Sequence, residues 1–287
     1  MRAIRFLYSN PLYIFWFLLH FTIAWFILGA DIDSLVLVSI IYTITISFAL
    51  SEPGEYLLLI LENCREPRTK QEKSYLLPIF EEVLQDAREI NPEIREDTEL
   101  YIKEVMYVDT FAVGKKSVVV TQGAIETFTD NELKGLIAHE LGHITFGHTK
   151  AILLTSIGNL FFTIIVWFFR LLLTIARFIS KELARKYFWG KVSFVLVFLT
   201  RVCTDVSVFL FINIGEIILA MNSRVNDMQA DTFVIEVGYG MELISGLYLM
   251  QKITMTGEAS LLERMKASNP NVAYRIEQLE EYEDNMY

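Results

Sequence analysis

Long apolar runs alternate with mixed segments along the chain and indicate how it is organised. Residues 12–30 are apolar apart from His20 and one threonine, and residues 35–50 form a second apolar run after a short acidic turn. At about 1.5 Å per residue, a helix over the first run approaches the roughly 30 Å thickness of a bilayer's hydrocarbon core. The two runs therefore predict a transmembrane hairpin.

Basic residues flank this expected hairpin at both ends. Arg2 and Arg5 precede it, and four basic residues follow it between positions 65 and 73, whereas the turn carries none. The positive-inside rule then places both ends of the hairpin in the cytosol. A cleaved signal peptide is the alternative for the first run, although its apolar core would be only about 7–15 residues long.

Residues 51–150 mix polar and apolar positions, which indicates a soluble region. Thr129 and Glu132 have the spacing of a capping box, so a helix is expected from about 131 to 149. Helical spacing of apolar residues and runs of strand-forming residues predict, respectively, a helix over 78–90 and strands over 100–108 and 117–121.

A second pair of apolar runs follows the soluble region. Residues 152–169 carry no charge, and residues 202–221 are apolar apart from Asp205, which can pair with Arg201 one turn earlier, and Glu216. Six basic residues lie between positions 170 and 191. If both runs cross the membrane, this basic loop lies outside, against the positive-inside rule. An incomplete or interfacial hairpin is the alternative.

Composition agrees with a membrane protein and argues against one class of partner. Hydrophobic residues make up 53% of the 287 positions, more than one globular core needs. The formal charge of -10 offers no basic face for phosphates, which excludes nucleic acid as an expected partner. The two cysteines, Cys64 and Cys203, are too far apart in sequence to indicate a disulfide framework.

The sequence His139-Glu140-Leu141-Gly142-His143 lies inside the helix expected from 131 to 149. Histidines four positions apart project from one helix face and can offer two neutral imidazoles to one Zn²⁺. The glutamate between them can then act as general base toward a water that zinc activates. A chance match with solvated histidines is the alternative, which the capped helix makes less attractive.

Zinc needs a third protein ligand, and no histidine after His148 supplies one. On a continuous helix His148 lies about 180° from His139, so it is expected to be a structural or surface histidine. The metzincin pattern fails, because Phe146 and Thr149 stand where it requires glycine and histidine.

The sequence resembles the HtpX-type membrane zinc metalloproteases, which are relatives of the CAAX prenyl proteases. The layout matches, with two apolar helices before the His-Glu-Leu-Gly-His segment and two apolar runs after it. The segments that carry the resemblance are 109–148, 223–231, and Ser268-Asn269-Pro270 followed by Arg275-Ile276.

The resemblance implies a complete site for one zinc ion per chain. The family's third ligand is a glutamate four residues before the aspartate of an Ala-Asp pair, and Asp227 stands at that position, one methylene shorter. Asp231 matches the carboxylate that accepts a hydrogen bond from a ligating histidine, and Arg224 matches an arginine that organises nearby acids or contacts substrate. Asn269 stands where relatives often carry histidine. The small Ala230 can permit close helix packing.

The expected fold is α+β and mostly helical: an integral-membrane protein whose transmembrane helices accompany a gluzincin-like zinc metallopeptidase domain with a small sheet. The chain divides into a transmembrane hairpin (1–50), a cytosolic catalytic region (51–150), a second apolar pair (151–222), and the third-ligand helix with C-terminal helices (223–287).

The expected function is hydrolysis of peptide bonds by a membrane-embedded zinc endopeptidase in which Glu140 moves the proton. The resemblance implies an inner or plasma membrane location in a lipid bilayer, an active site on the cytosolic side, and misfolded membrane proteins as polypeptide substrates. Processing of a dedicated peptide is the alternative within enzymes. An inactive pseudoprotease scaffold is the alternative outside them.

A substrate-binding strand is expected just before the catalytic helix. Ser117, Val118, Val119, Val120 and Thr121 have strand composition, and an exposed edge there would pair with the backbone of an extended peptide. An ordinary core strand is the alternative.

Overall fold

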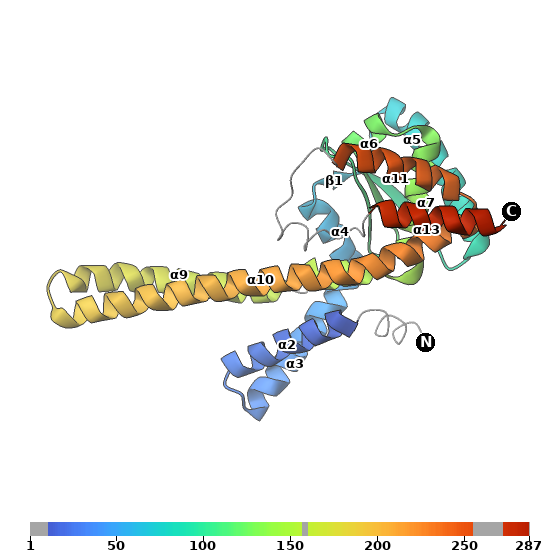
Figure 1. Ribbon diagram of the computed structural model, residues 1–287. Coiled ribbons are helices and arrows are strands. Elements are labelled where there is room, and N and C mark those ends of the chain that lie inside the picture. Colours follow the sequence, from blue (N-terminus) through green and yellow to red (C-terminus); the bar gives the residue numbers. More distant parts are fainter. Residues whose placement is uncertain (1–10, 157–159, 255–271, 287) are drawn as a thin grey trace.

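The computed structural model describes residues 11–156, 160–254 and 272–286. Most of these residues are helical, and a small sheet lies within the body from which two helical hairpins extend (Figure 1). The helices are α2 (Pro11–Ile27), α3 (Ile32–Ala49), α4 (Glu52–Leu61), α5 (Lys70–Ile90), α6 (Gln122–Thr127), α7 (Asp130–Phe146), α8 (Thr149–Ser156), α9 (Leu160–Ala184), α10 (Phe188–Val237), α11 (Gly240–Thr254) and α13 (Val272–Met286).

The sheet is mixed, with the strand order β1-β2-β4-β3. β1 and β3 pair antiparallel with their neighbours, and β2 and β4 run parallel. The strands are β1 (Cys64–Arg65), β2 (Glu99–Lys103), β3 (Thr110–Val113) and β4 (Ser117–Thr121).

Both faces of the sheet are covered. Val118 and Val120 of β4 join the main core, to which α5, α7, α10, α11 and α13 contribute. Val119 points the other way, into a smaller cluster with Leu58 of α4 and Leu153 of α8. This alternation follows from the period of two along a strand, and it explains why β4 is apolar on consecutive positions.

The expectation that Ser117–Thr121 forms an exposed edge strand is wrong. β4 pairs with β2 on one side and with β3 on the other, and all five of its residues are buried. A strand enclosed on both faces and both edges cannot take up a substrate backbone. The edge strand that packs against α7 is β3 instead.

Two helix boundaries differ from those expected. α5 begins at Lys70 rather than at Pro78, because Thr69 and Glu72 form a capping box that nucleates the earlier turns. α7 is capped by Thr129 and Glu132 as expected, but it ends at Phe146 because Gly147 adopts a left-handed conformation with φ 73°.

Two of the described helices are long and apolar enough to cross a membrane: α3 over Ile32–Ala49 and the first part of α10 over Phe188–Phe209. Only 17% and 0% of these windows are buried, so neither is the core helix of a globular domain. A shorter apolar helix, Ile14–Phe26 within α2, contacts α3 and α10. The coarse expectation of apolar helical hairpins attached to an α+β body is thus confirmed.

The second apolar pair differs from the expected layout. Most of the basic stretch lies within α9 and α10 rather than in a loop, and the second apolar window begins at Phe188 rather than at residue 202. One ion pair joins the two helices: Asp205 of α10 lies 2.8 Å from Arg170 of α9. Asp205 also lies 3.8 Å from Arg201, one turn earlier on α10, as expected.

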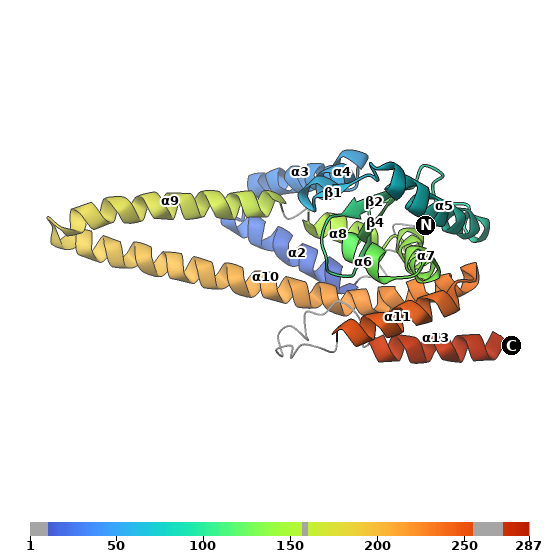
Figure 2. The same ribbon diagram turned by 90° about the horizontal axis from the view of Figure 1, so that it is seen from above.

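α10 connects this hairpin directly to the body. It is one helix of 50 residues, about 75 Å long, and its C-terminal part runs alongside α7, α11 and α13 (Figure 2). The boundary expected between residues 222 and 223 therefore falls inside a continuous helix.

Replacing Val119 with proline should abolish folding and activity together. Proline cannot donate to the ladder of a central strand, and the buried acceptor left without a partner costs about 1–3 kcal/mol before any loss of packing is counted. Thermal unfolding in detergent measures the loss, with Val119→Ala, which keeps the N–H, as the milder control. If the Val119→Pro protein folded normally and lost only its cleavage activity, β4 would be a substrate-binding strand after all.

Candidate metal centre

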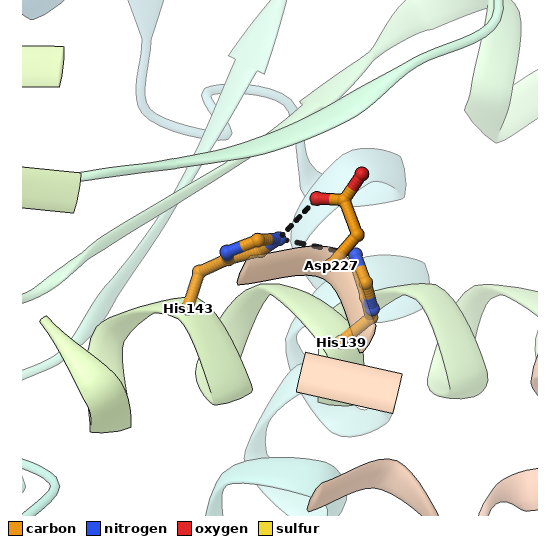
Figure 3. A group of neighbouring side chains, drawn as sticks. All are labelled: His139, His143 and Asp227. Carbon is orange, nitrogen blue, oxygen red and sulfur yellow. Dashed lines mark hydrogen bonds and ion pairs between the residues drawn. The ribbon is translucent and has the colours of Figure 1, made fainter. Parts of the chain in front are cut away.

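The two histidines of α7 face each other on one side of the helix. Their Nε2 atoms lie 3.1 Å apart, as expected for positions one turn apart (Figure 3). His139 is buried, and His143 is half-buried. The structure therefore places the two imidazoles as the sequence pattern predicts.

Asp227 reaches these histidines from α10. Its Oδ1 lies 3.4 Å from Nε2 of His143, and one ligand atom from each of the three side chains falls within 4.8 Å of the others (Figure 3). The two helices touch at Gly142 and Ala230, where a Cβ on the glycine would lie 3.0 Å from Cα of the alanine. This close approach lets the short aspartate side chain reach the histidines.

A buried ion pair stands behind His139. Asp231 of α10 places Oδ1 2.8 Å from Nδ1 of His139, and it accepts two hydrogen bonds from Arg275 of α13, at 2.6 and 2.7 Å. Burial alone would raise the pKa of Asp231, but the charge of Arg275 and the hydrogen bonds from Arg275 and His139 hold that pKa well below its usual range. The carboxylate is therefore ionised and fixes the orientation of the imidazole.

His148 lies next to His143, on the side of its Nδ1 atom, a position that was not predicted. Because Gly147 ends α7, the chain turns back and places Nδ1 of His148 3.0 Å from Nδ1 of His143. Nε2 of His148 lies 3.0 Å from Oε1 of Gln229. Burial lowers the pKa of His148 to about 3, so it is neutral. It is structural, as one alternative held, but it is not at the surface.

The tautomers that satisfy these outer partners leave the right atoms free for a metal. With a proton on Nδ1, His139 donates to its carboxylate partner and His143 donates to the neutral imidazole behind it. Each Nε2 then presents a lone pair toward the other and toward Asp227. Oδ2 of Asp227 has no hydrogen-bond partner in the described part of the chain, although the residue is only 4% exposed. Such a donor set fits a cation.

Glu140 follows His139 on α7, and its side chain is hydrogen-bonded to the edge strand β3. Oε1 of Glu140 accepts a hydrogen bond of 3.0 Å from Oγ1 of Thr110, the first residue of β3. The preceding residue, Asp109, has its pKa raised to about 7 by burial and then by the charge of Glu140. Neither Asp109 nor Thr110 was predicted to have a role, because their only signal was a position just before a strand.

The remaining expected site residues fall into three groups. Asp231 lies next to His139, as expected, whereas Ser117–Thr121 forms the interior strand β4. The side chains of Arg224 and Glu216 and the segment Ser268-Asn269-Pro270 lie outside the described residues. Arg275, which was expected only as part of the C-terminal Arg275-Ile276 motif, donates hydrogen bonds to Asp231.

Two histidines and a carboxylate beside a further glutamate form the arrangement used by metal-dependent hydrolases. Residues 72–283 match the model of peptidase family M48, and the chain belongs to this family. The resemblance drawn from the sequence is thereby confirmed.

Several known proteins are similar to parts of the chain. The metalloprotease LoiP of Escherichia coli K12 is 35% identical over 52 residues, which cover 18% of this chain and 21% of that protein. A protease HtpX homolog of Dictyoglomus turgidum is 32% identical over 140 residues, 46% of this chain and 43% of the relative. The chain thus spans less than half the length of these relatives. The solved structure of S. mikatae Ste24p is similar over 87% of this chain and 66% of its own chain. The two chains are 16% identical, and the TM-score is 0.42.

Removing Arg275 should destabilise the protein strongly. Arg275→Met leaves the charge of Asp231 buried without its partner, which costs about 3–5 kcal/mol. Thermal unfolding in detergent gives the loss as a fall in Tm. The matched control is Arg88→Met, whose partner Glu96 is 86% exposed and whose loss should cost at most about 1 kcal/mol. Equal effects of the two substitutions would contradict a buried ion pair behind His139.

Asp109 should make stability depend on pH. Because its folded-state pKa is raised from 3.8 to about 7, its contribution to stability is complete below pH 3.8 and is lost as pH rises through 7. Asp109→Asn keeps an uncharged acceptor, so it should raise Tm by ~2–4 °C at pH 8.5, about 1 kcal/mol, and change little near pH 4.

The control for this pH effect is Asp97→Asn. The guanidinium of Arg95 lowers the pKa of Asp97 to about 2, so its contribution to stability is present above the unfolded-state value. This control variant should gain nothing at pH 8.5. If Asp97→Asn raised Tm at pH 8.5 as much as Asp109→Asn, the cause would be the change in net charge and not the burial of Asp109.

Proposed function

We propose that the chain is a zinc-dependent endopeptidase in which His139, His143 and Asp227 hold the metal and Glu140 is the general base. The observation that carries the proposal is the group of two Nε2 atoms and an unpartnered buried carboxylate oxygen within reach of one cation. Tetrahedral zinc with three protein ligands keeps one position open for chemistry. We propose one ion per chain because the described part of the chain holds one such group.

Zinc bound there would act as a Lewis acid on the scissile carbonyl and lower the pKa of water toward about 7. Glu140 takes one proton from the attacking water as the water oxygen adds to the carbonyl carbon. It returns that proton to the amine nitrogen when the C–N bond breaks. The hydrogen bond from Thr110 engages only Oε1 of Glu140, which leaves Oε2 for this transfer.

The outer residues keep the ligands in position. Asp231, supported by Arg275, holds the proton of His139 on Nδ1, and His148 does the same for His143. Arg224 lies three positions before Asp227 on α10, and we assign it a role among the acids of this site or with substrate.

The proposed substrate is an extended polypeptide bound along β3. This strand has β4 on one side and lies at the end of the sheet order, so its other side can pair with a peptide backbone without reading a particular sequence. Thr110 connects the same strand to Glu140, which supports β3 as the docking edge.

The proposed setting is a lipid bilayer of the inner or plasma membrane, with the catalytic body on the cytosolic side. Exposed apolar surfaces on α3 and α10 support membrane insertion, and basic residues after α3 support the orientation. The similarity to proteases named HtpX supports a role in proteolytic quality control, with misfolded membrane proteins as clients.

Two substitutions should separate metal binding from proton transfer. Asp227→Ala should abolish tight zinc binding, whereas Asp227→Glu should retain zinc and much of the activity, because glutamate is also an oxygen donor. Glu140→Gln should keep zinc but lower kcat by about 10²–10⁴-fold, since an amide cannot accept the proton. Elemental analysis of purified protein and cleavage of casein measure the two properties.

Asp231→Ala is the intermediate control and should weaken zinc affinity about 10–100-fold. Stoichiometric zinc in Asp227→Ala would show that the ligand assignment is wrong. Substantial cleavage by zinc-loaded Glu140→Gln would exclude Glu140 as the base. A wild-type protein that binds zinc and cleaves nothing would instead be a pseudoprotease scaffold.

A further inference from the structure

The geometry points to Thr110 as a positioning residue for the proposed reaction: its hydroxyl orients the carboxylate of Glu140 from the edge strand. This inference rests on the proposed function, because it concerns the group assigned as general base. Its basis is the 3.0 Å hydrogen bond from Oγ1 of Thr110 to Oε1 of Glu140.

The main chain around Thr110 is fixed on both sides. Its N–H donates to Oδ1 of Asp109 at 3.0 Å, and Thr110 pairs with Val120 of β4 in the sheet. The N–H of Asp109 in turn donates to Oγ1 of Thr121, at 3.0 Å, and the N–H of Thr121 donates to the backbone oxygen of Asp109, at 3.1 Å. These bonds hold the start of β3 against the central strand.

The side chain of Thr110 is also restricted. A β-branched residue in a strand has few χ1 rotamers, so its hydroxyl is confined to a small region once the backbone is fixed. Glu140, in contrast, has a long side chain whose terminal torsion is broad. A fixed donor that holds one oxygen of a mobile carboxylate limits where the other oxygen can go.

The carboxylate of Glu140 needs this orientation for its assigned task. Glu140 is 5% exposed and projects from a helix position next to His139, so its place relative to the metal group depends on side-chain torsions. Proton transfer requires a heavy-atom separation of about 2.6–3.2 Å from the water. With Oε1 bonded to Thr110, Oε2 is left to make that contact.

Thr110 also connects substrate binding to the base. Its backbone belongs to the strand proposed to pair with the peptide, while its hydroxyl contacts Glu140. A change at the side chain alone should therefore affect the chemical step and spare backbone pairing. This difference separates a positioning residue from a substrate contact.

The test compares Thr110→Val with Thr110→Ser in the full-length, zinc-loaded protein in detergent. Valine keeps the shape and the β-branch but cannot donate, so kcat for casein cleavage should fall about 10-fold with KM and zinc content unchanged. Serine keeps the donor and should restore most of kcat. Ile102→Val, in the core on the interior strand β2 and not on the proposed docking edge, is the control for general damage to the sheet and should leave kcat intact.

The same measurements in a Glu140→Gln background distinguish the two levels of the proposal. There Thr110→Val should cause no further loss, because the proton acceptor is already absent. Unchanged kcat in Thr110→Val, or a rise in KM alone, would overturn the role of Thr110 while leaving Glu140 as base. Full activity in Glu140→Gln itself would overturn the proposed function instead.

Discussion

The close approach of α7 and α10 is the constraint on which the rest of the site depends. Gly142 and Ala230 leave so little material between the helices that a Cβ on the glycine would lie 3.0 Å from the neighbouring Cα. An aspartate carries its carboxylate on a short side chain, so it can meet two histidines on a facing helix only at such a separation. The short side chain of Asp227 and the small residues at this helix crossing therefore depend on each other.

Local features of the chain could be predicted from the sequence because they depend on neighbours in sequence. The capping box at Thr129 and Glu132 and the shared face of His139 and His143 are set by a single helix turn. Asp227 could be placed only by family resemblance, since no spacing rule connects it to a helix more than 80 positions earlier. Its position next to His143 is a property of the fold.

Two errors show where sequence reasoning stops. The apolar run Val118-Val119-Val120 identifies a strand, but strand order decides whether its edges are free, and both are occupied. The role of His148 was missed because its angle was counted along an unbroken helix. Gly147 ends that helix, and as a result the imidazoles of His143 and His148 lie within hydrogen-bonding distance.

The unbroken course of α10 has a consequence for how this chain can change in length. Phe188 and Asp227 lie about 60 Å apart on one helix, so a single residue inserted between them would turn one end by about 100° relative to the other. Asp227 and Asp231 would then leave His143 and His139, or the hairpin would rotate its paired charges away from α9. An insertion or deletion at the turn between α9 and α10 leaves the helical phase of Asp227 and Asp231 unchanged, so the hairpin can change in length there without disturbing the site.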